Sequence, residues 1–444
     1  MSENKSNSAF TSKVGLIMAT AGSAVGLGNI WKFPYIAGEN GGGAFLIIYL
    51  ICVLVFGLPM LMTEFVIGKQ SGKSAFSAFR ALRNNNRWQL LSWSCFLTAF
   101  LIMGFYFVVT GWCFHYFISA IAHTFKGLDT ADFGAHFDSF VHNNPSMITY
   151  SFLAVILTAS VLWFDVNKGI ERLSKILMPL LLIMMCIMAG CVLMLPDSNI
   201  GVSFFLHADF SKITPHVILA AMGQCFFSLS IGMGAVITYG AYMPKRQNIM
   251  ATSLQVAVID TLVAVFAGLI IFPAVFAFGV NPSEGPQLVF VVLPAIFEKM
   301  TFPWFSSIMF FGLLCVAAIT STISLMEVAV AFLTDATEKR KHPLNRPKAV
   351  LIVSAIVLAL VVLDARFEGV FMWSDMLTAN ILMPANALAM ALFIGWHLNK
   401  NDVRRDLGKQ SGWQYKVSTA FIPIVRYIVP LAILAIFLNG LGLL

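Results

Sequence analysis

Charged residues are scarce in this chain. They make up 11% of its 444 residues, whereas a soluble globular protein carries roughly 25%. Apolar residues reach 59%, above the roughly 45–50% of soluble domains. This balance excludes a water-soluble enzyme, a nucleic-acid-binding protein and a disordered chain. We therefore expect no nucleic acid as a partner.

Motifs that hold metals or catalyse hydrolysis are also missing. The sequence has no CxxC pair and no HExxH spacing among its eight histidines. Those patterns would be typical of zinc, redox or metalloprotease sites. All seven cysteines lie inside apolar runs, so we expect small buried hydrophobic residues. We predict that the chain is not an enzyme and carries no organic cofactor.

Long apolar stretches are what the sequence does contain. A membrane span needs roughly 20 such residues. The polar N-terminus has no signal-peptide pattern, so the first stretch is expected to remain as a membrane helix. The fold class predicted is an all-α polytopic membrane protein of about 11 transmembrane helices, forming one domain over 1–444 in a lipid bilayer. The stretches are 14–37, 44–68, 89–123, 148–164, 174–195, 214–242, 252–279, 303–333, 349–363, 377–397 and 420–443.

Basic residues predict the orientation of these spans, because they gather in every second loop. The segment 69–87 holds five bases and no acid, whereas 126–147 holds three aspartates and one lysine. Basic loops face the cytoplasm. The N-terminus is then cytoplasmic and the C-terminus outside, and the net charge of +7 is a topology signal. Short loops and the lack of an outer glycosylation sequon favour a bacterial inner membrane.

Two spans are interrupted near their middle by small residues, at Gly22–Gly28 and at Ser228–Gly234. An unwound helix exposes backbone groups at a cost of several kcal/mol each in hydrocarbon. Freed carbonyls suit a small cation, and a half-helix N-terminus suits a carboxylate. The two breaks lie five spans apart, which indicates inverted repeats over about 11–195 and 210–398, with an extra helix over about 420–443. The alternative is that these glycines only allow close helix packing.

The residues around both breaks carry a resemblance. The run Gly22-Ser-Ala-Val-Gly-Leu-Gly-Asn-Ile-Trp-Lys-Phe-Pro34 and the run Gly223-Gln-Cys-Phe-Phe-Ser-Leu-Ser-Ile-Gly-Met-Gly-Ala235 resemble the first and sixth spans of the neurotransmitter:sodium symporter family. The resemblance covers about 10–400, and bacterial members such as the leucine transporter are most similar in kind. It implies a sodium-coupled symporter that imports a neutral, hydrophobic or aromatic amino acid by alternating access. A transporter-like amino-acid sensor or a channel is the alternative, and a homodimer stays open.

The resemblance also implies the site residues. Two sodium ions are expected. The first would bind Ala24, Asn29, Ser228 and Asp260, with the substrate carboxylate completing the site. The second would bind Gly22, Val25, Ala317, Thr320 and Ser321. The substrate pocket would be lined by Ala24, Gly26, Gly28, Ile102, Tyr106, Phe227, Ser228, Ser230, Met233, Ser321 and Leu325.

Asp260 departs from the pattern of the leucine transporter, which has Asn at this position. Relatives that depend on chloride bind it beside this point, at positions matching Tyr49, Gln224, Ser228 and 264, and position 264 here is Ala. An acid within the membrane is a functional hypothesis in itself. We expect Asp260 to supply the charge and transport to be independent of chloride. A purely structural hydrogen-bonding role is the alternative.

The gates are the last set that the resemblance implies. An outer gate would pair Lys32 with Asp375, unless Lys32 only extends to the outer surface. An inner gate would use Asp335 and Tyr242. The family has Arg and Trp where this chain has Asn7 and Phe10, so the usual cation partner of Asp335 is missing. Lys13 or Lys5 is a candidate substitute, and closure by weaker contacts is the alternative. Gly169 and Pro179 in the fifth span match a spacing that lets the cytoplasmic half unwind. Glu64 and Glu327 are assigned to packing networks.

Overall fold

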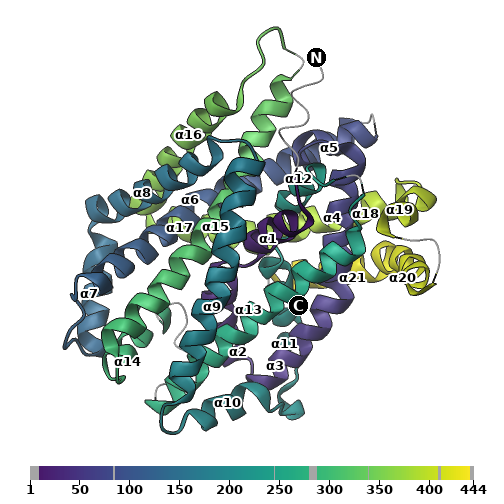
Figure 1. Ribbon diagram of the computed structural model, residues 1–444. Helices are drawn as coiled ribbons and strands as arrows, with labels where there is room; N and C mark the ends of the chain where they lie inside the picture. The colour runs from purple at the N-terminus through teal and green to yellow at the C-terminus, as the bar shows by residue number, and fades with distance from the viewer. Residues whose placement is uncertain are drawn as a thin grey trace.

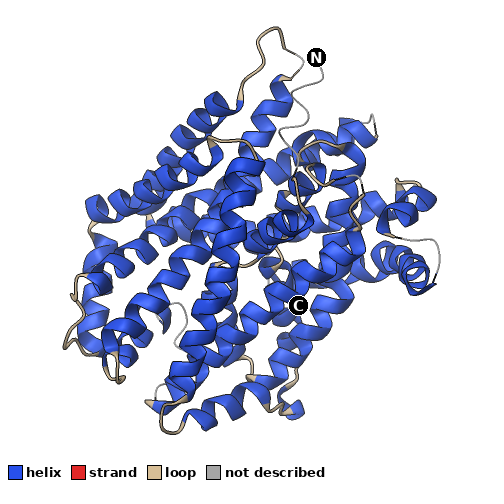
Figure 2. Cartoon of the chain, viewed as in Figure 1, coloured by secondary structure: helices blue, strands red, loops and turns tan. Residues whose placement is uncertain are grey.

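The computed structural model describes residues 10–83, 86–244, 246–279, 288–338, 340–408 and 412–440. Over these residues the chain is helical and no strand is present (Figure 2). The helices form a single bundle in which distant segments lie side by side (Figure 1). The predicted all-α class is therefore confirmed.

Nine of the described helices are long and apolar enough to cross a membrane. Several combine an α-helix with a π-helical turn, as in α3–α4, α17–α18 and α20–α21. The nine are Gly43–Ser71 (α3–α4), Gln89–Ile121 (α6), Asn144–Leu162 (α8), Asn167–Leu193 (α9), Ile249–Ala277 (α13), Pro303–Thr337 (α15), Arg346–Arg366 (α16), Glu368–Trp396 (α17–α18) and Gln414–Leu438 (α20–α21).

Two of the predicted spans are interrupted, and the first of them raises the number of candidate spans among the described residues to ten, against about eleven predicted. The first consists of Lys13–Ala24 (α1) and Gly28–Glu39 (α2 with the π-helical turn before it), bent by 50°. The sixth consists of α11 (Pro215–Ser228) and α12 (Ala235–Ala241). Its halves are too short to span a membrane separately, because a span needs roughly 20 residues. Both predicted breaks are confirmed.

Shorter helices lie at the two ends of the bundle. In Figure 1, α5 and α19 lie toward the upper right of the bundle. The helices α7, α10 and α14 lie toward its lower left and bottom. Their bounds are Ala75–Leu82 (α5), Thr130–His142 (α7), Ser198–Leu206 (α10), Leu293–Glu298 (α14) and Lys400–Leu407 (α19).

Local capping sets several of these boundaries. Thr214 precedes Pro215 at the start of α11, and its hydroxyl accepts from the Val217 backbone 3.3 Å away. Asn345 caps α16 in the same way, one residue before Arg346. A side-chain oxygen at the N-cap satisfies an amide without an intrahelical partner. Proline in the first turn removes another such amide.

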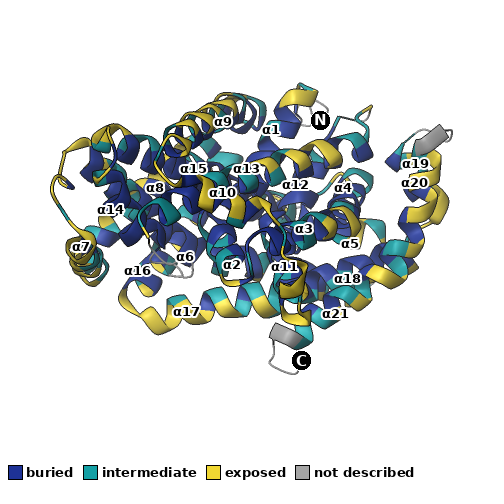
Figure 3. Ribbon diagram, turned by 90° about the horizontal axis from the view of Figure 1, so that it is seen from below, coloured by how far each residue is buried: buried dark blue, intermediate teal, exposed yellow. Residues whose placement is uncertain are grey.

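Burial follows the expectation for a protein whose solvent is lipid. Large apolar side chains are exposed along the outer helix faces, including Leu54, Ile156 and Ile183, and the inner helices are almost wholly buried (Figure 3). Five cysteines are buried and Cys191 is half-buried, but Cys186 is exposed. The expectation of burial is therefore wrong for Cys186, which lies on the outward face of α9.

The centre of the bundle is built by α1, α6 and α15. The two longest helices, α6 and α15, pack along each other, and α1 contacts α15, α9 and α13. α12 packs on α4 and also contacts α1 and α15. The breaks in the first and sixth spans therefore meet between α6 and α15.

Candidate functional site

The break in the first span is short. α1 ends at Ala24 and the next helical turn begins at Gly28, so only Val25–Leu27 interrupt the helix. Asn29 closes the gap from within, since its backbone N–H donates to Gly26 O (3.1 Å) and its side-chain oxygen accepts from Gly26 N (3.1 Å). The break is thus a defined turn rather than a loose segment.

The break in the sixth span is longer and its backbone is unusual. Ser230 has a φ of +56°, and Gly232 and Gly234 have φ of +91° and +83°. A left-handed serine costs free energy and persists only where its surroundings hold it. Glu64 accepts from Gly232 N at 2.8 Å, and Asn386 donates to Gly232 O at 2.9 Å. Glu64, which we assigned to packing, therefore satisfies the backbone of this break.

One cavity lies between the two breaks. Ten of the eleven predicted substrate-binding residues line it, together with Ser23. Ser228 is the one predicted residue absent from the lining, and its hydroxyl instead contacts the Asn29 side chain. The volume is about 30 Å³, enough for about one water molecule. Binding a larger molecule requires the lining side chains to move.

Polar groups meet at one side of this cavity. The Leu27 backbone N–H donates to the Tyr106 hydroxyl at 3.1 Å, and the Ser230 hydroxyl donates to Ser23 O at 2.9 Å. A β-carbon on Gly26 would lie 2.6 Å from Tyr106 Oη, and one on Gly28 would lie 2.9 Å from the Phe227 ring. Glycine at both positions lets the backbone approach these side chains closely.

The side chains of the first predicted sodium set are in direct contact. Asn29 Nδ2 donates to Ser228 Oγ and to Asp260 Oδ1, each at 2.8 Å. The other oxygen of Asp260 accepts from Ser228 at 2.7 Å and from Tyr49 at 3.3 Å. Asn29 presents its amide nitrogen, and only its oxygen could bind a cation. Sodium binding there would require this amide to rotate.

The second predicted set also comes together. Ser321 Oγ donates to Val25 O at 3.2 Å and lies 3.5 Å from Gly22 O. Thr320 Oγ1 donates to Ala317 O at 2.9 Å. Carbonyl oxygens of the first span therefore lie beside the Ser321 hydroxyl of α15, whereas the Thr320 hydroxyl bonds within α15. Such oxygen donors suit hard cations.

No alternative metal site competes with these two sets in the described part of the chain. Groups of three or more His, Cys, Asp or Glu side chains that could hold a metal ion are absent there. Gln224, a predicted chloride-cage position, donates to Gly28 O at 2.9 Å, and Ala264 is fully buried. Neither offers a second charge beside Asp260.

The predicted outer gate is not an ion pair in this structure. Among the ion pairs of the described residues, none joins Lys32 to Asp375. Lys32 Nζ lies 4.2 Å from the ring centroid of Phe227, a cation–π contact. Asp375 lies in α17, near enough to Tyr35 to interact electrostatically. Lys32 thus contacts an aromatic residue that lines the cavity.

At the inner end, the partner of Asp335 differs from the prediction. Asp335 accepts from the Ser74 backbone at 2.8 Å and the Ser74 hydroxyl at 2.6 Å, and Lys73 Nζ lies 3.9 Å away. Lys13 makes no ion pair among the described residues, whereas Lys5 and Asn7 lie outside them. The expectation of Lys13 is therefore wrong, because the loop after α4 brings Lys73 closer.

Aromatic contacts take the place of the missing Arg and Trp at this inner end. Phe10 is buried, its backbone N–H donates to Tyr242 O at 3.1 Å, and its ring packs edge-on against Tyr239 at 5.7 Å. Tyr242 also donates to Glu327 at 2.8 Å. Arg346 binds both carboxylate oxygens of Glu327 at 3.0 and 2.5 Å. Glu327 is thus part of a buried ion pair.

Sequence reasoning missed two functional candidates at this end. Arg346 is one, and Glu171 is the other, with its carboxylate almost fully buried. Glu171 accepts from Thr11 N (2.7 Å), the Thr11 hydroxyl (2.9 Å), the Ser12 hydroxyl (2.8 Å) and Lys175 Nζ (2.7 Å). An acid among the bases Lys168, Arg172 and Lys175 was the available signal for Glu171. Nothing in the sequence paired Arg346 with Glu327.

Comparisons with known proteins agree with this geometry. A family model described as "Sodium:neurotransmitter symporter family" matches residues 7–129 and 137–442. An uncharacterized sodium-dependent transporter of Bacillus subtilis, YhdH, is 37% identical over 98% of this chain and 98% of its own. A counterpart from Haemophilus influenzae is 36% identical over 99% of each chain.

A solved structure has the same fold. The crystal structure of MhsT in complex with L-phenylalanine matches with a TM-score of 0.88 at 36% identity, over 97% of this chain and 99% of that chain. The two breaks and the helices around them therefore belong to an architecture that occurs in an amino-acid complex.

Proposed function

The chain belongs to the sodium:neurotransmitter symporter family, and we propose that it imports a neutral, hydrophobic or aromatic amino acid together with sodium. Membership makes it a sodium-dependent membrane transporter rather than an enzyme. The single observation that carries the finer proposal is the cavity between the two breaks. Its lining unites the predicted substrate residues of four separate spans.

The chemistry of that cavity supports an amino acid without a charged side chain. Its lining has no ionisable acid or base, and the larger contributions come from Ile102, Phe227, Met233 and Leu325. One end offers the Tyr106 hydroxyl beside the break of the first span. We assign the substrate carboxylate to this end, because the backbone amides of a helix break and a hydroxyl suit an anion.

Coupling to sodium follows from a shared ligand. The substrate carboxylate would complete the first sodium set, so each ligand raises the affinity of the site for the other. The second set, between Val25 and Ser321, links α1 to α15. Sodium there would favour closure of α1 against α15, and its release would loosen them. Alternating access then moves both cargoes across the membrane.

Asp260 supports transport that is independent of chloride. Its carboxylate lies within hydrogen-bond distance of Asn29, Ser228 and Tyr49, and a negative charge there would balance sodium without a bound anion. A structural role remains the competing explanation, and replacing chloride separates the two. We also propose two inverted repeats, a cytoplasmic N-terminus, an outward C-terminus and residence in a bacterial inner membrane.

Proteoliposomes test the proposal directly. We expect uptake of a labelled neutral amino acid with an inward sodium gradient, none with potassium in its place, and no loss when gluconate replaces chloride. Preloaded unlabelled substrate should accelerate entry of the label, which a channel or a sensor would not do. Uptake that ignores the sodium gradient would contradict the proposal.

A further inference from the structure

A second cavity, larger than the one between the breaks, lies at one end of the bundle. A pocket of about 760 Å³ opens where α5, the start of α6 and the end of α15 meet. This end of the bundle carries the basic loops, so it is the predicted cytoplasmic end. Small-molecule sites commonly have volumes of about 300–1,000 Å³. Lys73 and Asp335 of the inner gate line this pocket, but the proposed substrate and sodium sites do not use it.

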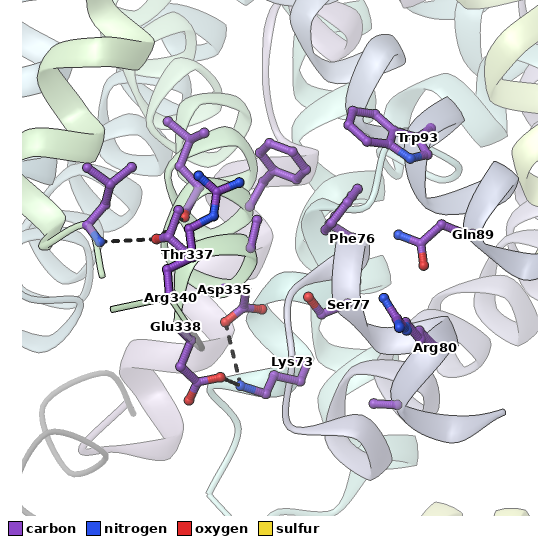
Figure 4. A pocket seen from close by; sticks show the side chains of 15 residues that line it. Lys73, Phe76, Ser77, Arg80, Gln89, Trp93, Asp335, Thr337, Glu338 and Arg340 are labelled. Atoms are coloured by element: carbon purple, nitrogen blue, oxygen red, sulfur yellow. Dashed lines mark hydrogen bonds and ion pairs between the residues drawn. The ribbon is translucent and has the colours of Figure 1, made fainter. Parts of the chain in front are cut away.

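Three bases and two acids line the pocket, and they are not equally paired. Lys73 contacts both Asp335 and Glu338. Arg80 and Arg340 are exposed, and neither guanidinium has a hydrogen-bond or ion-pair partner among the described residues. Figure 4 shows the two guanidinium groups on opposite sides of Asp335. The pocket therefore offers two unpaired donors that suit a phosphate.

One wall of the pocket is formed by the aromatic side chains Phe76, Trp93 and Phe332. Phe76 packs edge-on against Trp93 with ring centroids 5.0 Å apart, and against Phe332 at 4.2 Å. Trp93 is half exposed. Tryptophan is enriched where hydrocarbon meets lipid headgroups. The pocket thus lies at the depth of a headgroup layer.

An apolar stripe runs from this wall into the membrane. Leu90, Trp93 and Leu97 lie on one face of α6 and are 75%, 50% and 48% exposed. Residues spaced three, four and seven apart share a helix face. Acyl chains on this stripe would bring an attached headgroup to Trp93 at the rim of the pocket. A free anion in solution has no acyl chain, so the stripe would not increase its affinity for the pocket.

We propose that this pocket binds the phosphodiester of an anionic phospholipid from the leaflet at this end, with Arg80 and Arg340 as its ligands. The lining has a formal charge of +1 from three bases and two acids, which one phosphodiester balances. Ser77 and Gln89 add uncharged hydrogen-bonding groups for a polyol headgroup. Phosphatidylglycerol has this combination of one negative charge and free hydroxyls.

Occupancy would bridge two elements that carry the inner gate. Arg80 lies in α5, which follows Lys73 and Ser74, whereas Arg340 follows α15, which carries Asp335. A phosphate held by both arginines reinforces the contact of Ser74 with Asp335. Bound lipid therefore stabilises the closed inner end.

The test uses the full-length protein in a neutral detergent and measures thermal unfolding. Phosphatidylglycerol should raise the unfolding temperature of the wild type, and phosphatidylcholine should raise it less. Arg80→Gln with Arg340→Gln should weaken lipid binding about tenfold or more, because hydrogen bonds to charged groups contribute about 1.5–3 kcal/mol. Arg172→Gln is the matched control, since Arg172 is also exposed, lies at the same end and makes no side-chain hydrogen bond or ion pair among the described residues.

Three outcomes would overturn the inference. The first is an equal lipid response in the double variant and the wild type. The second is an equal loss in the Arg172→Gln control. The third is an equal shift from soluble glycerophosphoglycerol or inorganic phosphate, which would indicate a free anion. Should the double variant fail to fold, Arg80→Lys with Arg340→Lys serves instead, because lysine keeps the charge but loses the two-pronged geometry.

Discussion

Asn29 and Asp260 are joined directly, with the amide nitrogen of one 2.8 Å from a carboxylate oxygen of the other. They come from spans one and seven, and both are completely buried. The Asn29 amide donates to Ser228 Oγ and Asp260 Oδ1, which are proposed sodium ligands. Asp260 therefore binds Asn29 in the structure and is also a proposed sodium ligand.

Asp260→Asn should therefore weaken the first sodium site, because it keeps an oxygen ligand but removes the negative charge. Removing the only full negative charge of the set weakens cation binding, so we expect sodium-driven uptake to fall about tenfold or more, corresponding to at least about 1.4 kcal/mol. Uptake of labelled substrate at several sodium concentrations measures this. Asp364→Asn, which removes a buried acid of α16, is the control. Equal loss in both variants would contradict a specific role of Asp260.

Tyr106→Phe should raise the substrate concentration needed for half-maximal uptake. The hydroxyl lost here accepts from Leu27 and is the proposed donor to the substrate carboxylate. We expect a weakening of about ten- to a hundredfold, from one hydrogen bond to a charged group. Tyr116→Phe is the matched control on the same helix, because Tyr116 Oη has no hydrogen-bond partner among the described residues. Similar KM values for the two variants would refute the assignment.

Gly26→Ala should close the substrate site. The added β-carbon would lie 2.6 Å from Tyr106 Oη and would also meet Ser321 Oγ, so the hydroxyls of both would have to move. Substrate-dependent thermal stabilisation should disappear. Gly223→Ala on α11 is the control, because no atom lies within 4 Å of its added β-carbon. Retained substrate stabilisation in Gly26→Ala would show that the carboxylate binds elsewhere.

Glu171→Gln should release the N-terminal segment. The carboxylate accepts four hydrogen bonds from Thr11, Ser12 and Lys175, and an amide cannot accept from all of these donors. A destabilisation of about 1–3 kcal/mol is expected for donors left unpaired. Hydrogen exchange of residues 10–24 should accelerate at neutral pH. Lys168→Gln, an exposed neighbour, should leave exchange there unchanged, and an unaffected Glu171→Gln would rule out the anchoring role.

Stability should fall in acid because of a histidine pair at the opposite end. His136 Nε2 lies 3.3 Å from His115 Nε2, and such a hydrogen bond needs one neutral ring to accept. Burial lowers the pKa of His136 below the ordinary value of about 6.5. The unfolded chain then binds more protons, so stability is present above about pH 6.5 and is lost as the pH falls below it.

Thermal unfolding between pH 5 and pH 8 measures this effect. His136→Gln should flatten the dependence, whereas His342→Gln, at an exposed histidine of the α15–α16 loop, should leave it as in the wild type. An unchanged pH profile in His136→Gln would assign the acid sensitivity to other groups.

The local sequence was sufficient to predict those functional features that are formed by consecutive residues. The positions of both breaks follow from small residues at Gly22–Gly28 and Ser228–Gly234, because loss of helix preference is a property of the run itself. The cavity lining could be named in advance by the family resemblance, although Ile102, Tyr106, Ser321 and Leu325 lie outside both runs. Boundaries shifted modestly, as at Glu368, where the tenth span begins nine residues before its predicted start.

Pairings between loops could not be derived in this way. Asp335 was identified, but Lys73 lies 262 positions before it in sequence, and only the packing of α5 on α15 brings them together. Glu171 and Arg346 were missed for the same reason. The partners of a charged side chain depend on which helix ends share a surface.

Composition, hydrophobic runs and the two broken segments determined by themselves that this chain crosses a membrane many times and interrupts two of those crossings. These are local properties, because transfer into lipid and helix propensity act residue by residue. Tertiary structure alone decided that Asn29 faces Asp260, that Glu171 holds the N-terminal segment, and that two arginines flank an aromatic-walled pocket. Such contacts depend on packing between distant segments, which no single run of sequence specifies.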